Sequence, residues 1–310
     1  MEEQEKVRVA IVGGGPGGMT TAIYLARAGI PCKIYEPGTP GGTMFLVHEI
    51  DNYPGFPEGV RGRELASLME AQVKRFGVEI VQMDVTRIEK YDGKFRVELG
   101  SGKEVIAEAV VVATGCRQKR LGIPGEAKLF GKGVSYCATC DGFFFKNQDV
   151  AVIGGGDSAV QEALYLSHVC RKVYIIHRRD QLRAKKLHQD RAMAKPNIEM
   201  VWNTVPEAVL GEKEVEGLLL KNVRTNEKRE LAVKGVFFYV GLDPINEMVA
   251  GLLHLCDEGF IRAGEDTQTS VPGIFAVGDI RKKTTRQIAS AVADGCQAAY
   301  SIEEYFLGKE

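Results

Sequence analysis

The pattern that most constrains the fold of this chain is a strand, a glycine-rich turn, a helix and a second strand, and it occurs twice. In the first copy, residues 7–12 form a short apolar run, and glycines occupy most positions from 13 to 18. Residues 20–28 then carry apolar side chains at helical spacing, and residues 33–36 form the next strand.

The second copy repeats this order from residue 149. The apolar strand 149–153 precedes the glycines 154–156, a helix over 159–166 and a strand over 172–177. Short apolar strands that alternate with helices are typical of a parallel sheet that is covered on both faces. We therefore predict two dinucleotide-binding βαβ units in one chain.

Later segments indicate how each unit is completed. Alternating strand-like segments follow each βαβ unit and lead to return strands at 110–115 and 236–241. The strand 274–279 and the helix 286–306 have no βαβ partner of their own, so we expect them to return to the first domain.

The predicted fold class is α/β, with two Rossmann-like dinucleotide-binding domains, the second inserted in the first. Each domain is expected to contain a parallel sheet and a small β-meander. The predicted boundaries are 1–117 with 245–310 for the first domain and 118–244 for the second, because glycines and prolines mark both crossings.

Composition excludes several classes of protein. The chain has 310 residues, enough for about two domains, and Lys+Arg 40 against Asp+Glu 41 leaves no basic excess for nucleic acid. No apolar run approaches the roughly 20 residues that span a bilayer, and the acidic start is neither a signal nor a transit peptide. We expect a cytoplasmic protein that binds neither nucleic acid nor membrane.

The first glycine turn has the dinucleotide-binding spacing Gly13-x-Gly15-x-x-Gly18. The first glycine permits a tight turn, the second lets the backbone approach a pyrophosphate, and the third permits close packing of helix on strand. Glu36 ends the next strand, where a carboxylate can bind a ribose 2′-hydroxyl. The first domain is therefore predicted to bind a dinucleotide without a 2′-phosphate.

The second turn, Gly154-x-Gly156-x-x-Ala159, is a permitted variant of the same motif. Its next strand ends not in an acid but in a basic cluster, which consists of His177, Arg178, Arg179 and Arg183. Guanidinium groups bind a 2′-phosphate through paired, charge-assisted hydrogen bonds. We therefore predict NADPH in the second domain, although a solvated basic helix end is the alternative.

A protein that holds two such cofactors most simply passes a hydride from NADPH to FAD. Gly278 and Asp279 end a strand and are expected to bind the ribityl or pyrophosphate region of the flavin. Arg286 and Gln287 open the last helix, where a cation and a helix N-terminus stabilise the charge of reduced flavin.

Of the seven cysteines, only Cys137 and Cys140 lie close together in sequence. Structural zinc needs four ligands and no second Cys or His pair accompanies this one, so no metal is predicted; inert buried thiols remain an alternative. We favour a redox-active disulfide, because CxxC thiols have lowered pKa values, with Asp141 as the acid/base. The remaining cysteines are interpreted as small core residues, and they are 32, 116, 170, 256 and 296.

Together these motifs resemble those of the low-molecular-weight, bacterial-type thioredoxin reductases, a family of flavoprotein pyridine nucleotide-disulfide oxidoreductases. The matching segments run in the family's order along the whole chain: GGGPGG at 13–18, DNYPGF at 51–56, ATG at 113–115, CATCDG at 137–142, GGGDSA at 154–159, HRRDQLRA at 177–184, and FAVGD to RQ at 275–287. CATCDG before the second turn is the most specific of them.

The resemblance implies a homodimer that passes a hydride from NADPH to FAD and then electrons to Cys137–Cys140 and to thioredoxin. Cys140 then lies nearer the flavin, Cys137 attacks the thioredoxin disulfide, and Asp141 exchanges the proton. The FAD-site residues are Gly13, Gly15, Pro16, Gly17, Gly18, Glu36, Gly42, Thr43, Asn52, Val85, Ala113, Thr114, Gly115, Gly278, Asp279, Arg286, Gln287 and Ile288. The NADPH-site residues are Gly154, Gly156, Asp157, Ser158, His177, Arg178, Arg179 and Arg183.

One segment departs from the family pattern. Thr43 and Met44 follow Gly42, where the family usually has Gln and Leu, so the contact that Gln makes with the flavin is in doubt. His48, a few residues later, is interpreted as an ordinary loop histidine.

Two other functions are compatible with the motifs. The first is a related flavin-dependent disulfide reductase with another protein or small-molecule acceptor. A peroxiredoxin-reducing relative of that kind carries an extra N-terminal domain, which we do not expect because the first strand begins at Val7. The second is a nucleotide-binding redox sensor without turnover.

Overall fold

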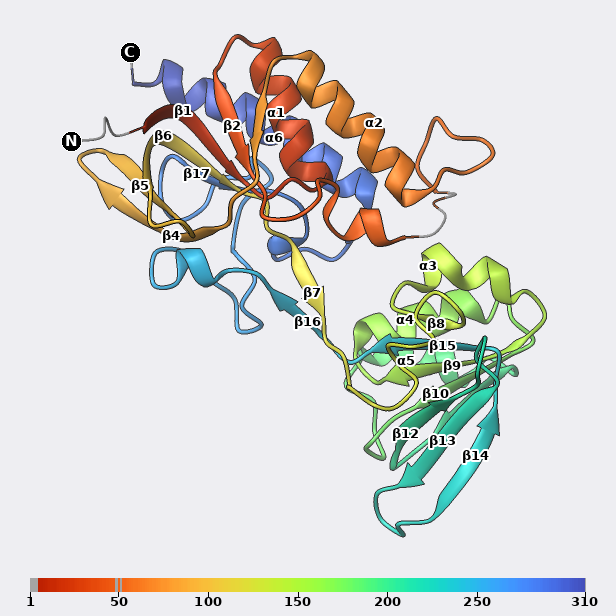
Figure 1. Cartoon of the computed structure of the whole chain (residues 1–310). Coiled ribbons are helices and arrows are strands. Elements are labelled where there is room, and N and C mark those ends of the chain that lie inside the picture. The colour runs from red at the N-terminus through yellow and green to blue at the C-terminus, as the bar shows by residue number, and fades with distance from the viewer. Residues whose placement is uncertain (1–4, 48–49, 51, 310) are drawn as a thin grey trace. The chain divides into compact units, whose positions relative to one another are not determined.

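A computed structural model describes residues 5–47, 50 and 52–309 of the chain. These residues form two compact units (Figure 1). Unit 1 comprises the chain up to Arg117 together with the chain from Asp243 onward, and unit 2 comprises Gln118–Leu242. Each unit has its own parallel sheet and its own hydrophobic core.

Unit 1 contains a sheet of seven strands. Its path runs β3-β2-β1-β6-β5-β4, with β17 paired to β6. The strands are β1 (Glu5–Val12), β2 (Cys32–Tyr35), β3 (Glu79–Val81), β4 (Val85–Tyr91), β5 (Lys94–Leu99), β6 (Glu104–Val112) and β17 (Ile274–Ala276). β17 returns from the end of the chain to pair in parallel with β6, as the sequence predicts.

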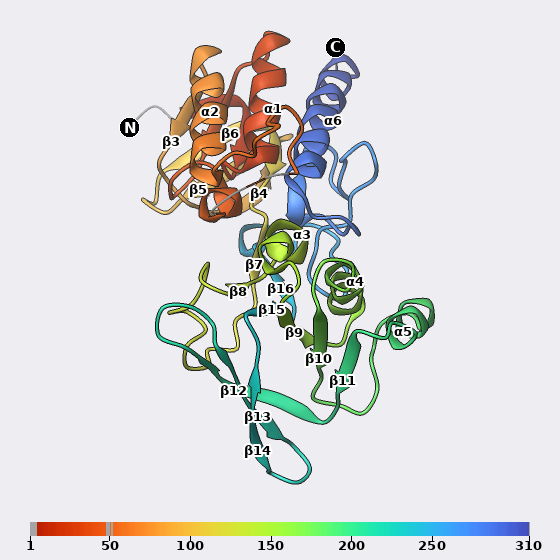
Figure 2. The ribbon, with the colours of Figure 1, turned by 90° about the vertical axis from the view of Figure 1, so that its right-hand side faces the viewer.

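The helices of unit 1 gather on one face of this sheet. They are α1 (Pro16–Arg27), α2 (Gly62–Arg75) and α6 (Ile288–Leu307), and α1 lies between the other two (Figure 2). Val9 and Ile11 of β1 point into the core under these helices, whereas Ala10 and Val12 point into the core on the opposite face. This alternation explains why β1 is apolar along its length: both of its faces are covered.

Strand β6 joins the parallel part and the antiparallel part of the sheet of unit 1. Along one edge it pairs with β1 in parallel. Along its other edge, the first half pairs antiparallel with β5 and the second half pairs in parallel with β17. Because β6 is nine residues long, the β4–β5 meander continues the parallel sheet of unit 1 and does not form a separate sheet.

Unit 2 repeats the arrangement with five parallel strands in the order β11-β10-β9-β15-β8. These are β8 (Val134–Ser135), β9 (Asp149–Gly154), β10 (Lys172–Ile176), β11 (Ile198–Val201) and β15 (Gly235–Tyr239). The helices are α3 (Ala138–Asp141), α4 (Asp157–Leu166) and α5 (Lys186–Met193), and the 3₁₀ turn η2 (Gly142–Phe145) follows α3 directly.

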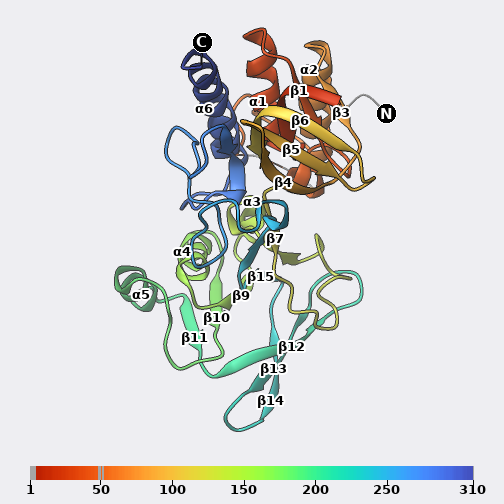
Figure 3. The ribbon, with the colours of Figure 1, turned by 90° about the vertical axis from the view of Figure 1, so that its left-hand side faces the viewer.

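The meander of unit 2 is a separate three-stranded sheet (Figure 3). Its strands are β12 (Thr204–Leu210), β13 (Gly217–Asn222) and β14 (Lys228–Ala232). Leu218 and Leu220 of this sheet pack against Ala151 and Ile153 of β9, so the meander covers the face of the parallel sheet opposite α4.

The two crossings between the units pair with each other. β7 (Cys116–Gln118) and β16 (Leu242–Pro244) form a two-stranded sheet. The 3₁₀ turns η1 (Gly42–Leu46), η3 (Glu247–Val249) and η4 (Gly278–Ile280) complete unit 1.

Several strands end earlier than the sequence pattern predicts. β6 ends at Val112, β15 at Tyr239 and β17 at Ala276, whereas the apolar runs continue to Gly115, Gly241 and Asp279. The residues beyond each strand leave the sheet at its carboxyl edge. In an open parallel sheet this edge is where ligands bind.

Candidate functional site

The glycine turn of unit 1 is open on its outer side, at Gly15, and packs tightly against the residue that follows β6 on its inner side, at Gly13. Gly13 has a φ of +109°, and a Cβ there would lie 2.5 Å from the Ala113 carbonyl oxygen. At Gly15 a Cβ would meet nothing within 4 Å. The turn is therefore closed on the sheet side and open on the other, which fits a pyrophosphate against the α1 N-terminus. Pro16, Gly17 and Gly18 form the first turn of α1.

Glu36 holds the turn from the end of β2. Its carboxylate accepts hydrogen bonds from the Gly14 N–H at 2.8 Å and from the Gly38 N–H at 2.9 Å. A carboxylate oxygen can accept more than one hydrogen bond, so acceptor capacity remains for a ribose hydroxyl.

Among the other expected residues of unit 1, Gly42, Thr43 and Thr114 lie around this turn, whereas Val85 does not. Gly42 approaches Gly15 directly, since a Cβ on Gly42 would lie 3.4 Å from the Gly15 Cα. Thr43 follows it in η1 and is exposed. Thr114 leaves β6 and donates from its hydroxyl to the Ile245 carbonyl at 2.6 Å. Val85 is buried in the core on the far face of the sheet.

Asp279 and Arg286 each carry one buried polar atom without a hydrogen bond in the described part of the chain, although Asp279 Oδ1 lies 3.8 Å from Lys283 Nζ and the other nitrogens of Arg286 bind backbone carbonyls. Asp279 Oδ1 and Arg286 Nε have no hydrogen-bond partner among the described residues. Burial raises the pKa of Asp279, while the charges of Lys283 and Arg286 oppose the shift. Buried atoms of this kind point to a missing partner, and the hydroxyl-rich chain of a flavin dinucleotide supplies both donors and acceptors.

The start of α6 joins these groups to the first loop. Gln287 caps the helix in a reciprocal pair with Ser290, and Ile288 is the first residue of the helix. Asn52 donates from Nδ2 to Gln287 Oε1 at 3.3 Å. Gly278 lies close to Gly17, whose Cβ would be 3.6 Å from the Gly278 nitrogen. His48 and Asp51 lie outside the described residues.

The glycine turn of unit 2 has the same two properties. Gly154 has a φ of +153°, and a Cβ there would lie 2.6 Å from the Tyr239 carbonyl oxygen, whereas a Cβ on Gly156 would meet nothing within 4 Å. Asp157 and Ser158 begin α4, and Asp157 Oδ1 accepts a hydrogen bond from the Lys185 N–H at 2.8 Å.

The basic cluster divides into one buried and three exposed side chains. His177 is buried, and its ring lies directly under Gly155, where a Cβ would be 2.4 Å from the ring. Burial lowers the pKa of His177, and the charges of Arg183, Arg179 and Arg178 add to the shift. Among the described residues, these three exposed guanidinium groups make no hydrogen bond or ion pair, so they are free to bind an anion.

The CxxC motif forms a disulfide at the start of α3. The Cys137–Cys140 bond has an S–S distance of 2.08 Å and a Cα–Cα distance of 5.3 Å. The short helix brings the two sulfurs together, since the Asp141 N–H donates to the Cys137 carbonyl at 3.1 Å.

Asp141 is held beside the disulfide by a residue that the sequence analysis did not identify. Ser135 donates from its hydroxyl to Asp141 Oδ2 at 2.6 Å, and its oxygen accepts from the Cys137 N–H at 3.0 Å. Ser135 thus links the acid to the backbone of the redox pair. The available signal was a serine two residues before a CxxC motif.

Two further side chains reach the redox pair from below. Tyr239, at the end of β15, accepts a hydrogen bond from the Ala138 N–H at 2.6 Å. The carboxylate of Glu162, on α4, accepts one from the Thr139 backbone. The sequence could have indicated Glu162, because this charged residue lies on the same side of an amphipathic helix as the buried Ala159 and Ala163.

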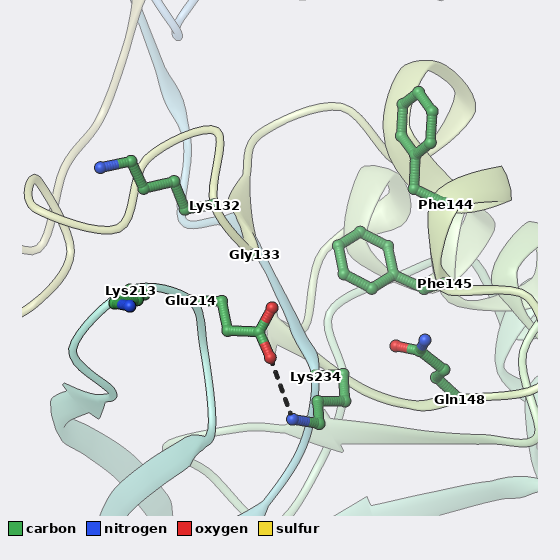
Figure 4. A pocket seen from close by; sticks show the side chains of 8 residues that line it. All are labelled: Lys132, Gly133, Phe144, Phe145, Gln148, Lys213, Glu214 and Lys234. Carbon is green, nitrogen blue, oxygen red and sulfur yellow. Dashed lines mark hydrogen bonds and ion pairs between the residues drawn. The ribbon is translucent and has the colours of Figure 1, made fainter.

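A cavity of about 390 Å³ lies next to the redox segment in unit 2 (Figure 4). Phe144 and Phe145 of η2 lie on one side of it, and charged side chains, among them Lys132 and Lys213, lie on the other. Phe143 and Phe144 are 60% and 53% exposed. Exposed aromatic side chains beside a reactive disulfide indicate a surface that a protein partner covers.

The remaining cysteines differ in burial. Cys32, Cys170 and Cys256 are buried, as expected, but Cys116 and Cys296 are half-buried, so these two are not core residues. Among the described residues, no group of His, Cys, Asp and Glu could hold a metal ion. In the same part of the chain, no helix combines the length and the apolar character that crossing a membrane requires.

Comparisons with known proteins agree with this geometry. The profile of the pyridine nucleotide-disulphide oxidoreductase family matches residues 7–295. A thioredoxin reductase of Streptomyces clavuligerus is 44% identical over 299 residues, which cover 96% of this chain and 93% of the relative. A thioredoxin reductase of Bacillus subtilis is 42% identical over 307 residues, covering 98% and 96%. The crystal structure of thioredoxin reductase from Streptococcus pyogenes superposes with a TM-score of 0.91 at 42% identity, covering 99% of this chain and 100% of that one.

Proposed function

The chain belongs to the pyridine nucleotide-disulphide oxidoreductase family, and we propose that it is an NADPH-dependent thioredoxin reductase with FAD as its flavin. The observation that carries the proposal is the Cys137–Cys140 disulfide, held beside Asp141 in the same unit as a dinucleotide-type glycine turn. When bound, the flavin accepts a hydride from the nicotinamide and supplies two electrons to this disulfide.

We propose that unit 1, residues 1–117 with the chain from about 245 onward, holds the FAD. The open face of Gly15 and the α1 N-terminus support a pyrophosphate there, and Glu36 supports a ribose hydroxyl. The buried Oδ1 of Asp279 would accept from a flavin hydroxyl. Arg286 and the capped start of α6, with Gln287 and Ile288, would supply positive charge and N–H donors to the flavin ring.

Unit 2, residues 118 to about 244, is proposed to hold NADPH. Gly156 offers the open backbone position for the pyrophosphate, and Arg178, Arg179 and Arg183 offer free guanidinium groups for the 2′-phosphate. The ring of His177 is buried under Gly155, and its lowered pKa keeps it neutral. It supports the backbone of the glycine turn and so fixes the shape of the turn.

Asp141 moves the protons of the dithiol step. Reduction of the disulfide consumes two protons, and attack on a second disulfide needs a thiolate, so a carboxylate beside the pair is required to exchange them. The hydrogen bond from Ser135 holds Asp141 in position for this exchange. Cys137 acts as the nucleophile toward thioredoxin, and Cys140 resolves the mixed disulfide.

The surface around the redox pair suits a protein substrate. Phe143 and Phe144 follow the pair and are largely exposed. Lys132, Lys213 and Lys234 line the adjacent cavity, and Lys234 forms an ion pair with Glu214 at 3.3 Å (Figure 4). Within the described part of the chain, Lys132 and Lys213 form no ion pair. Exposed aromatics rimmed by charge are typical of protein interfaces, and they support thioredoxin over a small-molecule acceptor.

We also propose that the enzyme is a cytoplasmic homodimer. Large apolar side chains on α2 and α6 of unit 1 are exposed, namely Leu68, Tyr300 and Leu307, and such side chains support burial against a second copy.

The test is NADPH oxidation coupled to thioredoxin. The purified, flavin-loaded protein should oxidise NADPH only when oxidised thioredoxin is present, and should do so much faster than with NADH. Rapid NADPH oxidation with a peroxiredoxin or a small disulfide, but not with thioredoxin, would move the assignment to a related reductase. An absence of turnover with every acceptor would indicate a redox sensor.

A further inference from the structure

A half-buried glutamate lies beneath the redox pair and has no part in the reaction described above. Glu162 belongs to α4, which packs against α3. Its carboxylate accepts a hydrogen bond from the N–H of Thr139, and the hydroxyl of Tyr239 accepts one from the N–H of Ala138. Both backbone amides between Cys137 and Cys140 are therefore bound by titratable side chains from the interior of unit 2.

One oxygen of this carboxylate is unsatisfied. Glu162 Oε2 is buried and has no hydrogen-bond partner among the described residues. Burial without full hydrogen bonding disfavours the ionised form, and it raises the pKa of Glu162 to about 7. Glu162 therefore changes its charge near neutral pH.

The groups that face Glu162 are few. From α3 the Thr139 amide contacts Glu162, and from β15 Tyr239 experiences the charge of Glu162. Asp141 of α3 acts on the same Tyr239. Tyr165 of α4 lies against Gly142 of η2. On the α5 side, His188 bonds to the neighbouring Gln161. The strands β9 and β10 present apolar side chains to α4, which are Val150, Val152, Val173 and Ile175. Burial is the main cause of the raised pKa of Glu162, and no Lys or Arg in the described part of the chain lowers it by its charge.

We propose that Glu162 is a positioning residue for the redox pair: it fixes the Thr139 amide between the cysteines, and its charge sets the pH at which the reduced pair forms a thiolate. An ionised Glu162 disfavours a second negative charge close by, whereas a protonated one does not. Tyr239 experiences the same field, since burial and then the charge of Glu162 raise its pKa well above the ordinary value. The inference rests on the proposed redox role of Cys137–Cys140.

The step that Glu162 controls is a proton equilibrium that follows reduction. Reduction breaks the Sγ–Sγ bond and adds two electrons and two protons, which gives two thiols. Reduced flavin supplies the electrons in turnover, and dithiothreitol supplies them in the test. One thiol must then lose its proton, through Asp141, before it attacks a second disulfide, and the charge on Glu162 sets the pH at which this proton leaves.

The test compares two variants of the flavin-loaded enzyme. Glu162→Gln keeps an acceptor for the Thr139 amide but removes the charge, and Glu162→Asp keeps the charge. After reduction with dithiothreitol, the alkylation rates of Cys137 and Cys140 are followed against pH by peptide mass spectrometry. In Glu162→Gln we expect the pH midpoint of the more reactive thiol to fall by about one unit, because a neighbouring like charge is lost. Glu162→Asp should restore most of the native midpoint.

The matched control is Glu199→Gln, which removes a carboxylate that is 46% exposed on β11 of the same unit. This control should leave the midpoint unchanged. An unchanged midpoint in Glu162→Gln, or an equal shift in Glu199→Gln, would overturn the proposal.

A second measurement needs no variant. In the native enzyme labelled with ¹³C-glutamate, the infrared difference spectrum between the oxidised and reduced pair should contain a glutamate carboxyl band. The absence of such a band across neutral pH would also overturn the proposal. Failure of the proposed function is distinguishable, because NADPH would then fail to reduce the pair in native enzyme and variants alike, while the dithiothreitol measurements could still be made.

Discussion

Replacing Arg178 and Arg179 by alanine should separate the two nicotinamide cofactors. Both guanidinium groups are exposed and make no ion pair or hydrogen bond within the described chain, so their removal leaves no protein group unpaired. A charge-assisted hydrogen bond contributes roughly 1.5–3 kcal/mol. Because both groups are solvated before binding, we take the lower end, and two contacts then give about 3 kcal/mol. This corresponds to a rise of about 150-fold in KM for NADPH.

The assay measures steady-state thioredoxin reduction with NADPH and with NADH. The KM for NADH should change by no more than about twofold, since NADH lacks the 2′-phosphate that the arginines bind. Arg191→Ala with Arg229→Ala, which removes two exposed charges elsewhere in unit 2, is the matched control and should leave both values unchanged. Equal losses with the two cofactors would show that Arg178 and Arg179 serve the fold of the turn and not the choice of cofactor.

Three further changes test other parts of the account. Cys137→Ser and Cys140→Ser should each abolish thioredoxin reduction but leave the flavin bound and reducible by NADPH in stopped-flow bleaching, because hydride transfer precedes the dithiol step; a flavin that no longer bleaches in either variant contradicts this order. Phe143→Ala with Phe144→Ala should raise the KM for thioredoxin about tenfold or more, since exposed aromatic anchors of this kind dominate protein interfaces, and an unchanged KM would remove these rings from the docking surface. Glu162→Gln should become more stable relative to the native enzyme as pH rises: the folded pKa of about 7 exceeds the unfolded value of 4.5, so native stability from this group is retained at low pH and is lost as pH rises through 7. The unfolding free energy of the variant relative to the native enzyme should rise by about 2.5 kcal/mol between pH 5 and pH 8, and parallel melting curves across that range would contradict it.

The repeated strand–turn–helix pattern was sufficient to predict the fold. Its apolar strands, such as β1 and β9, are buried on both faces, so local hydrophobicity and position in the sheet agree. The return of β17 to β6 also followed from the sequence, because this strand had no other partner. The ends of β6, β15 and β17 were placed too late, since apolar residues such as Val277 continue past the last ladder pair and are buried in the core under the helices.

The site was predictable where a motif carries the chemistry, as at Cys137–Cys140 and at the two glycine turns. It was not predictable where the contact is between distant segments. Glu162 and Tyr239 approach the redox pair from α4 and β15, and no sequence spacing links these elements to the CxxC motif. Ser135 lies only two residues before Cys137, but this spacing does not indicate that its hydroxyl binds Asp141. The sequence also did not indicate that the ring of His177 is buried under Gly155. Its contact with the nucleotide stays a prediction.

The most direct test of electron transfer from this disulfide to thioredoxin is to trap the mixed disulfide. Cys140→Ser removes the resolving thiol, so Cys137 should remain covalently joined to a thioredoxin that also lacks its own resolving cysteine. The account predicts a one-to-one adduct whose linking peptide contains Cys137 and which dithiothreitol releases. An adduct through Cys32, Cys116, Cys170, Cys256 or Cys296, or no adduct with a fully flavin-loaded enzyme, would contradict it.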